Sequence, residues 1–395
     1  TVGTATAPSA AAPSPEAGAA VARREATRGI VLLKNEGLLP LLADAKSIAV
    51  IGGHADAGVI SGAGSSQVAE QGGPAVVVPM GGEGFMAFLR NVYYHGSSPL
   101  KALQARIPAA SIHYVDASYP SAAAALARKS DVAIVFATQW MLEGYDSPDI
   151  SLPDGQDVLI AAVAAANPRT IVVLETGGPV LMPWLDKVGA VVEAWYPGAR
   201  GGEAITDILT GAASPSGRLP VTFPASLSQL PRPEIPGFGL PDAQVGAVRY
   251  PEGSDVGYRW FAAKGLKPLF PFGYGLSYTR FAYDDLKVTG GATLTVSFTV
   301  HNAGARAGVD TPQVYLTAAP NRRQQRLVGW STPELGPGES RRVSLSVDPR
   351  LLADWDERAH GWRIAGGAYK VALARSATDF VARGQADVGA RTLAP

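Results

Sequence analysis

One long loop of the sequence, residues 138–154 (TQWMLEGYDSPDISLPD), brings carboxylates and aromatic side chains together. Within it, Glu143 lies among Trp140, Met141, Leu142 and Tyr145. A carboxylic acid that donates a proton near neutral pH needs apolar surroundings, which disfavour its charged form. These four neighbours could supply them. For a lone glutamate, a solvated loop carboxylate is the commoner role. The length and aromatic content of this loop increase the weight of the alternative, a catalytic acid.

The other carboxylates near this loop have structural explanations. Turns and a helix cap are expected at Asp146, Asp149 and Asp154. Glu203 follows two glycines at the start of a predicted helix, where it would satisfy free amide groups and the helix dipole. Glu175 ends a predicted buried strand and is a weaker second candidate, which could pair with a cation such as Arg200 at the edge of the sheet.

Other catalytic and binding motifs are incomplete. The glycines after the first predicted strand do not form G-x-G-x-x-G, and no Lys-Ser/Thr closes a phosphate loop, so nucleotide binding has little support. The segment GLSYT at 275–279 is one residue from a nucleophile elbow but is not expected in a strand-to-helix turn. Cysteine is absent and the five histidines are scattered. The sequence therefore predicts neither a metal site nor a cofactor.

The elements that position the long loop follow an alternating pattern. Short runs rich in Val and Ile predict buried strands at 47–51, 111–115, 131–137, 170–175 and 190–195. Helices are predicted between them at 99–107, 121–129, 154–166 and 202–209. An earlier helix opens at Pro15, with Ala22, Ala26, Ile30 and Leu33 on one face. This α/β alternation indicates a mostly parallel sheet sandwiched by helices.

The pattern changes in the second half of the chain. A Pro/Gly-rich stretch leads to an aromatic segment at 258–278, expected to form an interdomain core. Beyond it, residues alternate with period two at 293–300, 313–317, 342–347 and 369–374, which indicates a β-sandwich. The predicted organisation is a linker at 1–15, an α/β domain at 16–230, a connector that packs on it at 231–283, and an all-β domain at 284–395.

Charge and hydropathy restrict the partners. Lys and Arg number 34, as do Asp and Glu. This balance gives no support for binding to nucleic acid or to an anionic membrane. The longest apolar runs fall well short of the roughly 18 residues that a membrane span requires. We therefore expect a neutral or weakly charged ligand.

Four segments, in this order and spacing, resemble the C-terminal portion of glycoside hydrolase family 3, the β-glucosidase and exo-β-glucanase family. They are GIVLLKN at 29–35, EGYD through LP at 143–153, AWYPG through GGEA at 194–204 with PSGRLP at 215–220, and PFGYGLSYT at 271–279. The segments PQVY at 312–315, LVGW at 327–330 and LGPGES at 335–340 resemble the fibronectin type III-like domain of that family.

The resemblance implies a retaining glycosidase. In such enzymes an N-terminal (β/α)8 barrel carries an aspartate nucleophile in a Ser/Thr-Asp-Trp segment, which this chain lacks; its nearest match is ADW at 353–355. Glu143 matches the acid/base, and Trp140 and Tyr145 would line the sugar subsites by implication. The two carboxyl groups must lie about 5 to 5.5 Å apart. The resemblance thus implies a β-glucoside or oligosaccharide substrate, a barrel domain or chain as partner, and a secreted or periplasmic location.

Two other functions remain open at this point. The chain could be a noncatalytic carbohydrate-binding or scaffold module, since a β-sandwich does not by itself determine function. A nucleotide-dependent α/β enzyme is disfavoured by the incomplete phosphate motifs. Thermal stabilisation by glucose rather than by nucleotides would distinguish these alternatives.

Overall fold

The computed structural model describes residues 14–41, 45–65, 67–70, 72–81, 90–238, 247–320 and 322–394. Apart from Ser14 and Pro15, the predicted linker at 1–15 lies outside this range. Ser14 caps the first helix, because its hydroxyl accepts a hydrogen bond from the backbone N–H of Ala17. Within the described residues, no helix is both long and apolar enough to cross a membrane.

A six-stranded sheet forms the centre of the N-terminal domain. In spatial order its strands are β1 (Val31–Asn35), β9 (Ala190–Glu193), β8 (Thr170–Thr176), β7 (Val132–Gln139), β2 (Ser47–Ile51) and β6 (Ser111–Val115). Only β1 is antiparallel to its neighbour within this sheet. Strand β8 is buried along its whole length, as expected where helices cover both faces. The predicted sheet is confirmed.

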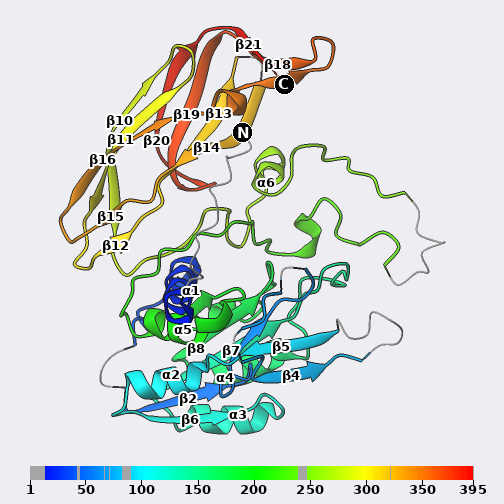
Figure 1. Cartoon of the computed structure of the whole chain (residues 1–395), viewed down its shortest axis with the longest axis vertical. Helices are drawn as coiled ribbons and strands as arrows, with labels where there is room; N and C mark the ends of the chain where they lie inside the picture. The colour runs from blue at the N-terminus through cyan, green and yellow to red at the C-terminus, as the bar shows by residue number, and fades with distance from the viewer. Residues whose placement is uncertain are drawn as a thin grey trace.

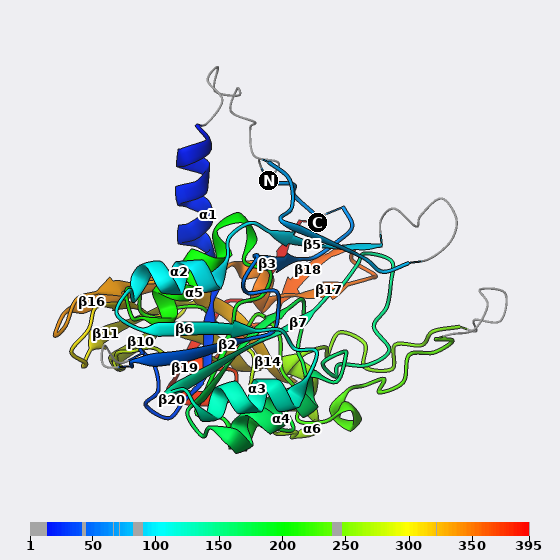
Figure 2. The same ribbon diagram turned by 90° about the horizontal axis from the view of Figure 1, so that it is seen from below.

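Helices cover both faces of this sheet (Figure 1). Those on one face are α1 (Pro15–Gly29), α2 (Pro99–Arg106) and α5 (Gly201–Leu209), and those on the other are α3 (Pro120–Arg128) and α4 (Gln156–Ala166). Figure 2 shows α1 standing out from α2 and α5. The prediction that this first helix includes Ile30 and Leu33 was wrong. Ile30 has extended backbone angles, and β1 then pairs with β9.

A second, small sheet lies beside the central one. Its strands β3 (Val59–Ser61), β5 (Asn91–His95) and β4 (Val76–Pro79) are antiparallel. Ile60, Val92 and Tyr94 form its buried core, against which Trp140 and Tyr196 pack. The sequence analysis did not predict this sheet, which covers the segments that follow the strands of the central sheet.

The connector joins the two domains through aromatic side chains. Within it, α6 spans Tyr258–Lys264. The ring of Tyr258 lies 4.8 Å from that of Phe272 and 5.8 Å from that of Tyr315 in the second domain, measured between centroids. On the other side, Phe270 packs into the core of the α/β domain. The prediction of an interdomain aromatic core is confirmed.

The C-terminal domain is a β-sandwich, as predicted. One sheet contains β10 (Phe281–Thr289), β11 (Thr295–Asn302) and β16 (Ser340–Ser346), and the other β14 (Arg322–Trp330), β13 (Gln313–Ala319), β19 (Gly367–Ser376) and β20 (Asp379–Val388). Short pairs and edges are formed by β12 (Gly308–Val309), β15 (Glu334–Leu335), β17 (Asp354–Asp356), β18 (Gly361–Ile364) and β21 (Arg391–Leu393). Every second residue of β11 is buried, which is the period-two pattern of a half-buried strand.

Four short 3-10 turns also lie within the described residues. They are η2 (Leu185–Lys187), η3 (Gly198–Arg200), η4 (Leu227–Gln229) and η6 (Pro349–Leu352). The turn η3 leads directly into α5, so the segment between β9 and α5 is short. The tripeptide ADW at 353–355 runs into β17 of the C-terminal domain, whereas the loop that follows β7 belongs to the N-terminal domain.

Candidate active site

The loop that carries Glu143 leaves the central sheet at the carboxyl end of β7. In parallel sheets, loops converge at this edge and create ligand sites. The ends of β8 and β9 lie next to it, because Gln139 is paired with Thr176 and Leu174 with Glu193. The loop also contacts the segment that follows β3, since the backbone N–H of Ala63 donates to the carbonyl of Met141 at 3.0 Å. Strand β7 and the segment that follows β3 therefore position this loop.

Glu143 lies at the tip of a tight turn. The backbone N–H of Tyr145 donates to the carbonyl of Leu142 at 3.2 Å, and Gly144 adopts a left-handed φ of 74°. The Oε2 atom of Glu143 accepts a hydrogen bond from the backbone N–H of Ser65 at 2.7 Å. A Cβ at Gly64 would lie only 2.4 Å from the Cβ of Glu143, so this close approach requires glycine.

The carboxyl group of Glu143 is exposed to solvent and is not surrounded by apolar side chains. Hydrogen bonds from the hydroxyl and then the backbone N–H of Ser65 lower its pKa. The apolar surroundings that Trp140, Met141 and their neighbours could have supplied are not formed around the carboxylate, which agrees with the commoner role of a solvated loop carboxylate. Those side chains pack beside the turn, whereas the carboxylate at its tip faces solvent and a hydrogen-bond donor.

A hollow of about 420 Å³ lies beside this turn and is lined by both predicted sugar-contacting residues. Its walls include Arg90, Gln139, Trp140, Met141, Leu142 and Tyr145. The guanidinium of Arg90 lies 5.4 Å from the centroid of the Tyr145 ring. The indole N–H of Trp140 is buried and has no hydrogen-bond partner among the described residues. Trp140 and Tyr145 thus share one hollow, which offers aromatic and other apolar surface.

Two glutamates are fully buried beneath the loops. Burial raises the pKa of Glu175 to about 8, although its Oε2 accepts the backbone N–H of Ile60 at 2.9 Å. Burial also raises the pKa of Glu193 well above the ordinary value. The predicted pairing of Glu175 with Arg200 was wrong, because Arg200 bonds to Glu203 at 3.1 Å. Sequence reasoning missed Glu193, which ends an apolar strand, whereas Glu175 is the second-last residue of its strand.

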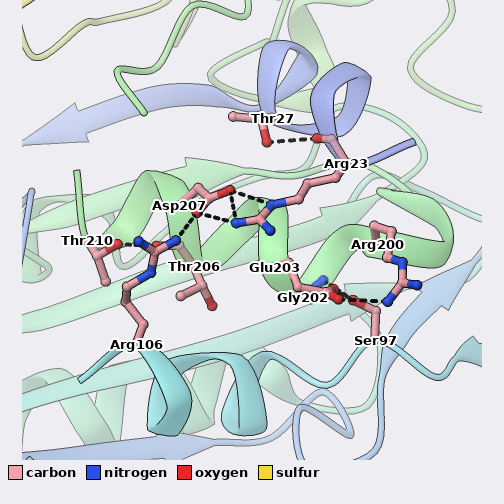
Figure 3. A network of polar contacts seen from close by, with 10 residues as sticks. All are labelled: Arg23, Thr27, Ser97, Arg106, Arg200, Gly202, Glu203, Thr206, Asp207 and Thr210. Atoms are coloured by element: carbon pink, nitrogen blue, oxygen red, sulfur yellow. Dashed lines mark hydrogen bonds and ion pairs between the residues drawn. The ribbon is translucent and has the colours of Figure 1, made fainter. Parts of the chain in front are cut away.

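A polar network fixes the helices on one face of the sheet (Figure 3). Asp207 accepts two hydrogen bonds of 2.7 Å from Arg23 of α1 and a further one from Arg106 of α2. Glu203, in the first turn of α5, accepts from the Ser97 hydroxyl and from Arg200. These bonds and its own backbone N–H outweigh burial and lower the pKa of Glu203. The helix-start role predicted for Glu203 agrees with its place.

Of the loop aspartates, Asp149 is a turn-maker as predicted, since its Oδ1 accepts the backbone N–H of Ser151 at 2.6 Å. The predicted helix cap at Asp154 was wrong. Asp154 and Gly155 both have left-handed φ, and α4 begins one residue later without a side-chain cap. Among the described residues, no group of three or more His, Cys, Asp or Glu side chains could hold a metal ion.

Sequence comparison identifies both domains. Residues 30–278 match the model of the glycosyl hydrolase family 3 C-terminal domain, and residues 310–377 match the fibronectin type III-like domain. Beta-glucosidase B of Emericella nidulans is 42% identical over 286 residues, which cover 68% of this chain and 34% of that protein. Thermostable beta-glucosidase B of Acetivibrio thermocellus is 34% identical over 376 residues, or 91% of this chain and 47% of that protein.

Solved structures agree with this assignment. DesR, a beta-glucosidase from Streptomyces venezuelae crystallised with D-glucose, is 30% identical with a TM-score of 0.82, over 98% of this chain and 62% of that chain. Beta-glucosidase 3B from Thermotoga neapolitana is 29% identical with a TM-score of 0.80, over 97% and 56%. The chain thus spans less than two thirds of these relatives' length. It belongs to glycoside hydrolase family 3, whose C-terminal α/β and fibronectin type III-like domains it contains.

Proposed function

We propose that this chain is the C-terminal part of a retaining β-glucosidase or exo-β-glucanase that removes terminal non-reducing β-D-glucosyl residues. In this proposal Glu143 is the general acid/base, and an aspartate nucleophile comes from an N-terminal barrel outside this chain. The observation that carries it is an exposed glutamate, fixed in place at the carboxyl edge of the sheet beside a hollow with aromatic walls. The relatives named beta-glucosidase support the reaction type.

The chemistry needs two states of Glu143. As an acid, it gives a proton to the glycosidic oxygen while the aspartate attacks the anomeric carbon. As a carboxylate, it then takes a proton from the water that releases glucose from the aspartate. A second carboxylate about 5 to 5.5 Å away, together with loss of water, raises the pKa of such a glutamate. The bond from Ser65 opposes that rise and favours the carboxylate needed in the second step.

Trp140 and Tyr145 are proposed to bind the sugar through their ring faces. Tyr145 is 55% exposed, so its ring is available to a ligand that enters the hollow. Trp140 adds its indole ring to the wall of the hollow, where it offers apolar surface to a sugar ring. Both residues lie within three positions of Glu143, on the same loop.

The first test replaces the proposed acid. In the complete enzyme, Glu143→Gln should lower kcat/KM by at least about a hundredfold for a β-glucoside with a poor leaving group. With 2,4-dinitrophenyl β-glucoside, which needs no acid assistance, kcat/KM should change little. Asp146→Asn, an exposed carboxylate on the same loop, is the matched control and should behave as the wild type. Near-normal rates in Glu143→Gln would remove this residue from the mechanism.

The second test uses the 395-residue chain by itself. Because the nucleophile lies elsewhere in this proposal, the chain should not hydrolyse an aryl β-glucoside above the buffer rate. Addition of a separately prepared barrel should restore turnover. Robust activity of the chain alone would contradict the proposed division of the active site.

A further inference from the structure

Tyr196 reaches from the segment between β9 and α5 to the base of the loop that carries Glu143. Its hydroxyl donates to the backbone carbonyl of Gln139 at 2.6 Å. That carbonyl lies at the end of β7, four residues before Glu143. A bond of this length between a tyrosine hydroxyl and a backbone carbonyl restrains the direction in which the chain leaves the strand.

The space around the Tyr196 ring is available only because two neighbours are glycines. A Cβ at Gly62 would lie 2.6 Å from the ring, and a Cβ at Gly177 would lie 2.7 Å from the Tyr196 hydroxyl oxygen. The same Cβ at Gly177 would also lie 2.7 Å from the sulfur of Met141. Tyr196 and Met141 therefore meet over Gly177, and the ring is wedged between two backbone segments.

The direction of Tyr196 is set by the buried Glu193. Trp195 has a left-handed φ of 59°, which is unfavourable for a bulky residue. Its backbone N–H donates to Oε1 of Glu193 at 2.8 Å, while Oε2 accepts the hydroxyl of Thr176 at 3.0 Å. The strained backbone at Trp195 is thus held by a fully buried side chain, and it turns Tyr196 toward β7.

The opposite side of the loop is held in a similar way. Glu175 accepts the backbone N–H of Ile60 on β3, and Ala63, just beyond β3, donates to the Met141 carbonyl. Ser65 then bonds to Glu143 itself. The loop is therefore held by hydrogen bonds to the carbonyls of Gln139 and Met141. Each of the two donor segments is in turn fixed by a buried glutamate, Glu193 on one side and Glu175 on the other.

From this arrangement we infer that Tyr196 is a positioning residue for the acid/base: its hydroxyl and its ring fix the loop so that the Glu143 carboxyl meets the glycosidic oxygen. The inference rests on the proposed function of Glu143. Tyr196 does not line the hollow and is not proposed to touch substrate. Small errors in the position of a catalytic group lower rates strongly, so loss of one such restraint should affect catalysis more than folding.

The test compares two tyrosine-to-phenylalanine variants in the complete enzyme. Tyr196→Phe should lower kcat/KM about tenfold for a β-glucoside with a poor leaving group, and less than twofold for 2,4-dinitrophenyl β-glucoside. Tyr278→Phe is the matched control, because its hydroxyl also donates to a backbone carbonyl, that of Ile208, at 2.8 Å. It should leave both constants unchanged. Equal losses with both substrates, or no loss with either, would overturn the inference.

A second readout needs only the 395-residue chain. Tyr196→Phe should speed hydrogen exchange at the Ala63 amide, which bonds to Met141, at least fivefold, and Tyr278→Phe should not. If Glu143→Gln lacks the leaving-group dependence described above, the proposed function fails. If Glu143→Gln shows it while Tyr196→Phe changes neither the rates nor the exchange, only the inference fails.

Discussion

Buried carboxylates in two regions of the molecule are neutralised in different ways. Where the two domains meet, Asp310 is 3% exposed and pairs with Arg218 at 2.9 Å, and it also accepts the hydroxyl of Tyr283 at 2.7 Å. At the carboxyl edge of the central sheet, Glu175 and Glu193 are fully buried, and neither takes part in an ion pair of the described residues. Desolvation raises their pKa values instead.

The difference separates a carboxylate at the domain contact from carboxyl groups at the edge of the sheet where we propose the active site. Asp310 lies against the guanidinium of Arg218, which compensates its charge. Glu175 and Glu193 are neutralised by a proton, which leaves them sensitive to pH and free to hydrogen-bond to loop backbone. The loops around Glu143 are therefore held by carboxyl groups that have no cationic partner among the described residues, whereas the domain contact contains an arginine–carboxylate ion pair.

The largest expected effect comes from removal of the carboxylate in the Arg218–Asp310 ion pair. Asp310→Ala leaves the guanidinium of Arg218 mostly buried without its partner, which should reduce the free energy of unfolding by about 3 kcal/mol. Urea denaturation followed by tryptophan fluorescence measures it. Asp379→Ala is the control, because its pair with Arg375 spans 3.4 Å between half-exposed side chains and should contribute within about 0.5 kcal/mol. Similar losses in both variants would contradict the comparison.

A smaller effect concerns pH. The native pKa of Glu175, about 8, lies above the ordinary glutamate value of 4.5. The folded state then binds more protons than the unfolded state between these values. The stability that protonated Glu175 contributes is fully present below pH 4.5 and is lost as the pH rises through 8. Glu175→Gln should flatten the decline in unfolding free energy from pH 6 to 8 by about 2 kcal/mol.

Glu203→Gln gives a control of opposite sign. The pKa of Glu203 is lowered, so its contribution is present above the ordinary glutamate pKa and is lost as the pH falls. The variant should therefore lose stability at pH 7 and approach the wild type at acid pH. If Glu175→Gln keeps the wild-type slope between pH 6 and 8, then Glu175 is not neutralised by a proton in the folded state.

The sequence predicts the parts of the molecule whose signal is local. Strands β7 and β8 are buried on both faces, and that requires an unbroken apolar run that is visible in the residues. The sandwich strand β11 is half-buried and so alternates. The end of α1 was missed because Ile30 suits a helical face equally well, and only pairing of β1 with β9 makes the backbone extended.

The candidate site depends on contacts between distant residues, which no local pattern contains. Loop length and aromatic content pointed to Glu143. The family resemblance implied Trp140 and Tyr145 as sugar-contacting residues, and these two do share a hollow. The charge state of Glu143 could not be predicted, because its hydrogen-bond donor Ser65 is 78 positions away. The same holds for Tyr196, whose partner Gln139 is 57 positions away.

The smallest expected effect concerns Glu143, which is the opposite of Glu175: exposed, with a pKa lowered mainly by the hydroxyl of Ser65. Ser65→Ala removes that hydroxyl but keeps the backbone N–H, so the pKa of Glu143 should rise toward the ordinary value. Ser65→Thr keeps a hydroxyl and should change it less. A carboxyl-carbon NMR titration of the 395-residue chain, with Glu143→Gln for assignment, measures both.

The sign of this shift also predicts a change in the complete enzyme. If Glu143 donates the proton, it must be protonated when substrate is attacked, so a higher pKa keeps the enzyme active to higher pH. The alkaline limb of kcat/KM should therefore move upward in Ser65→Ala and stay in place in Ser65→Thr. If the pKa of Glu143 shifts in the titration but the alkaline limb of kcat/KM does not move, another group determines that limb. Glu143 would then not be the group whose protonation controls catalysis.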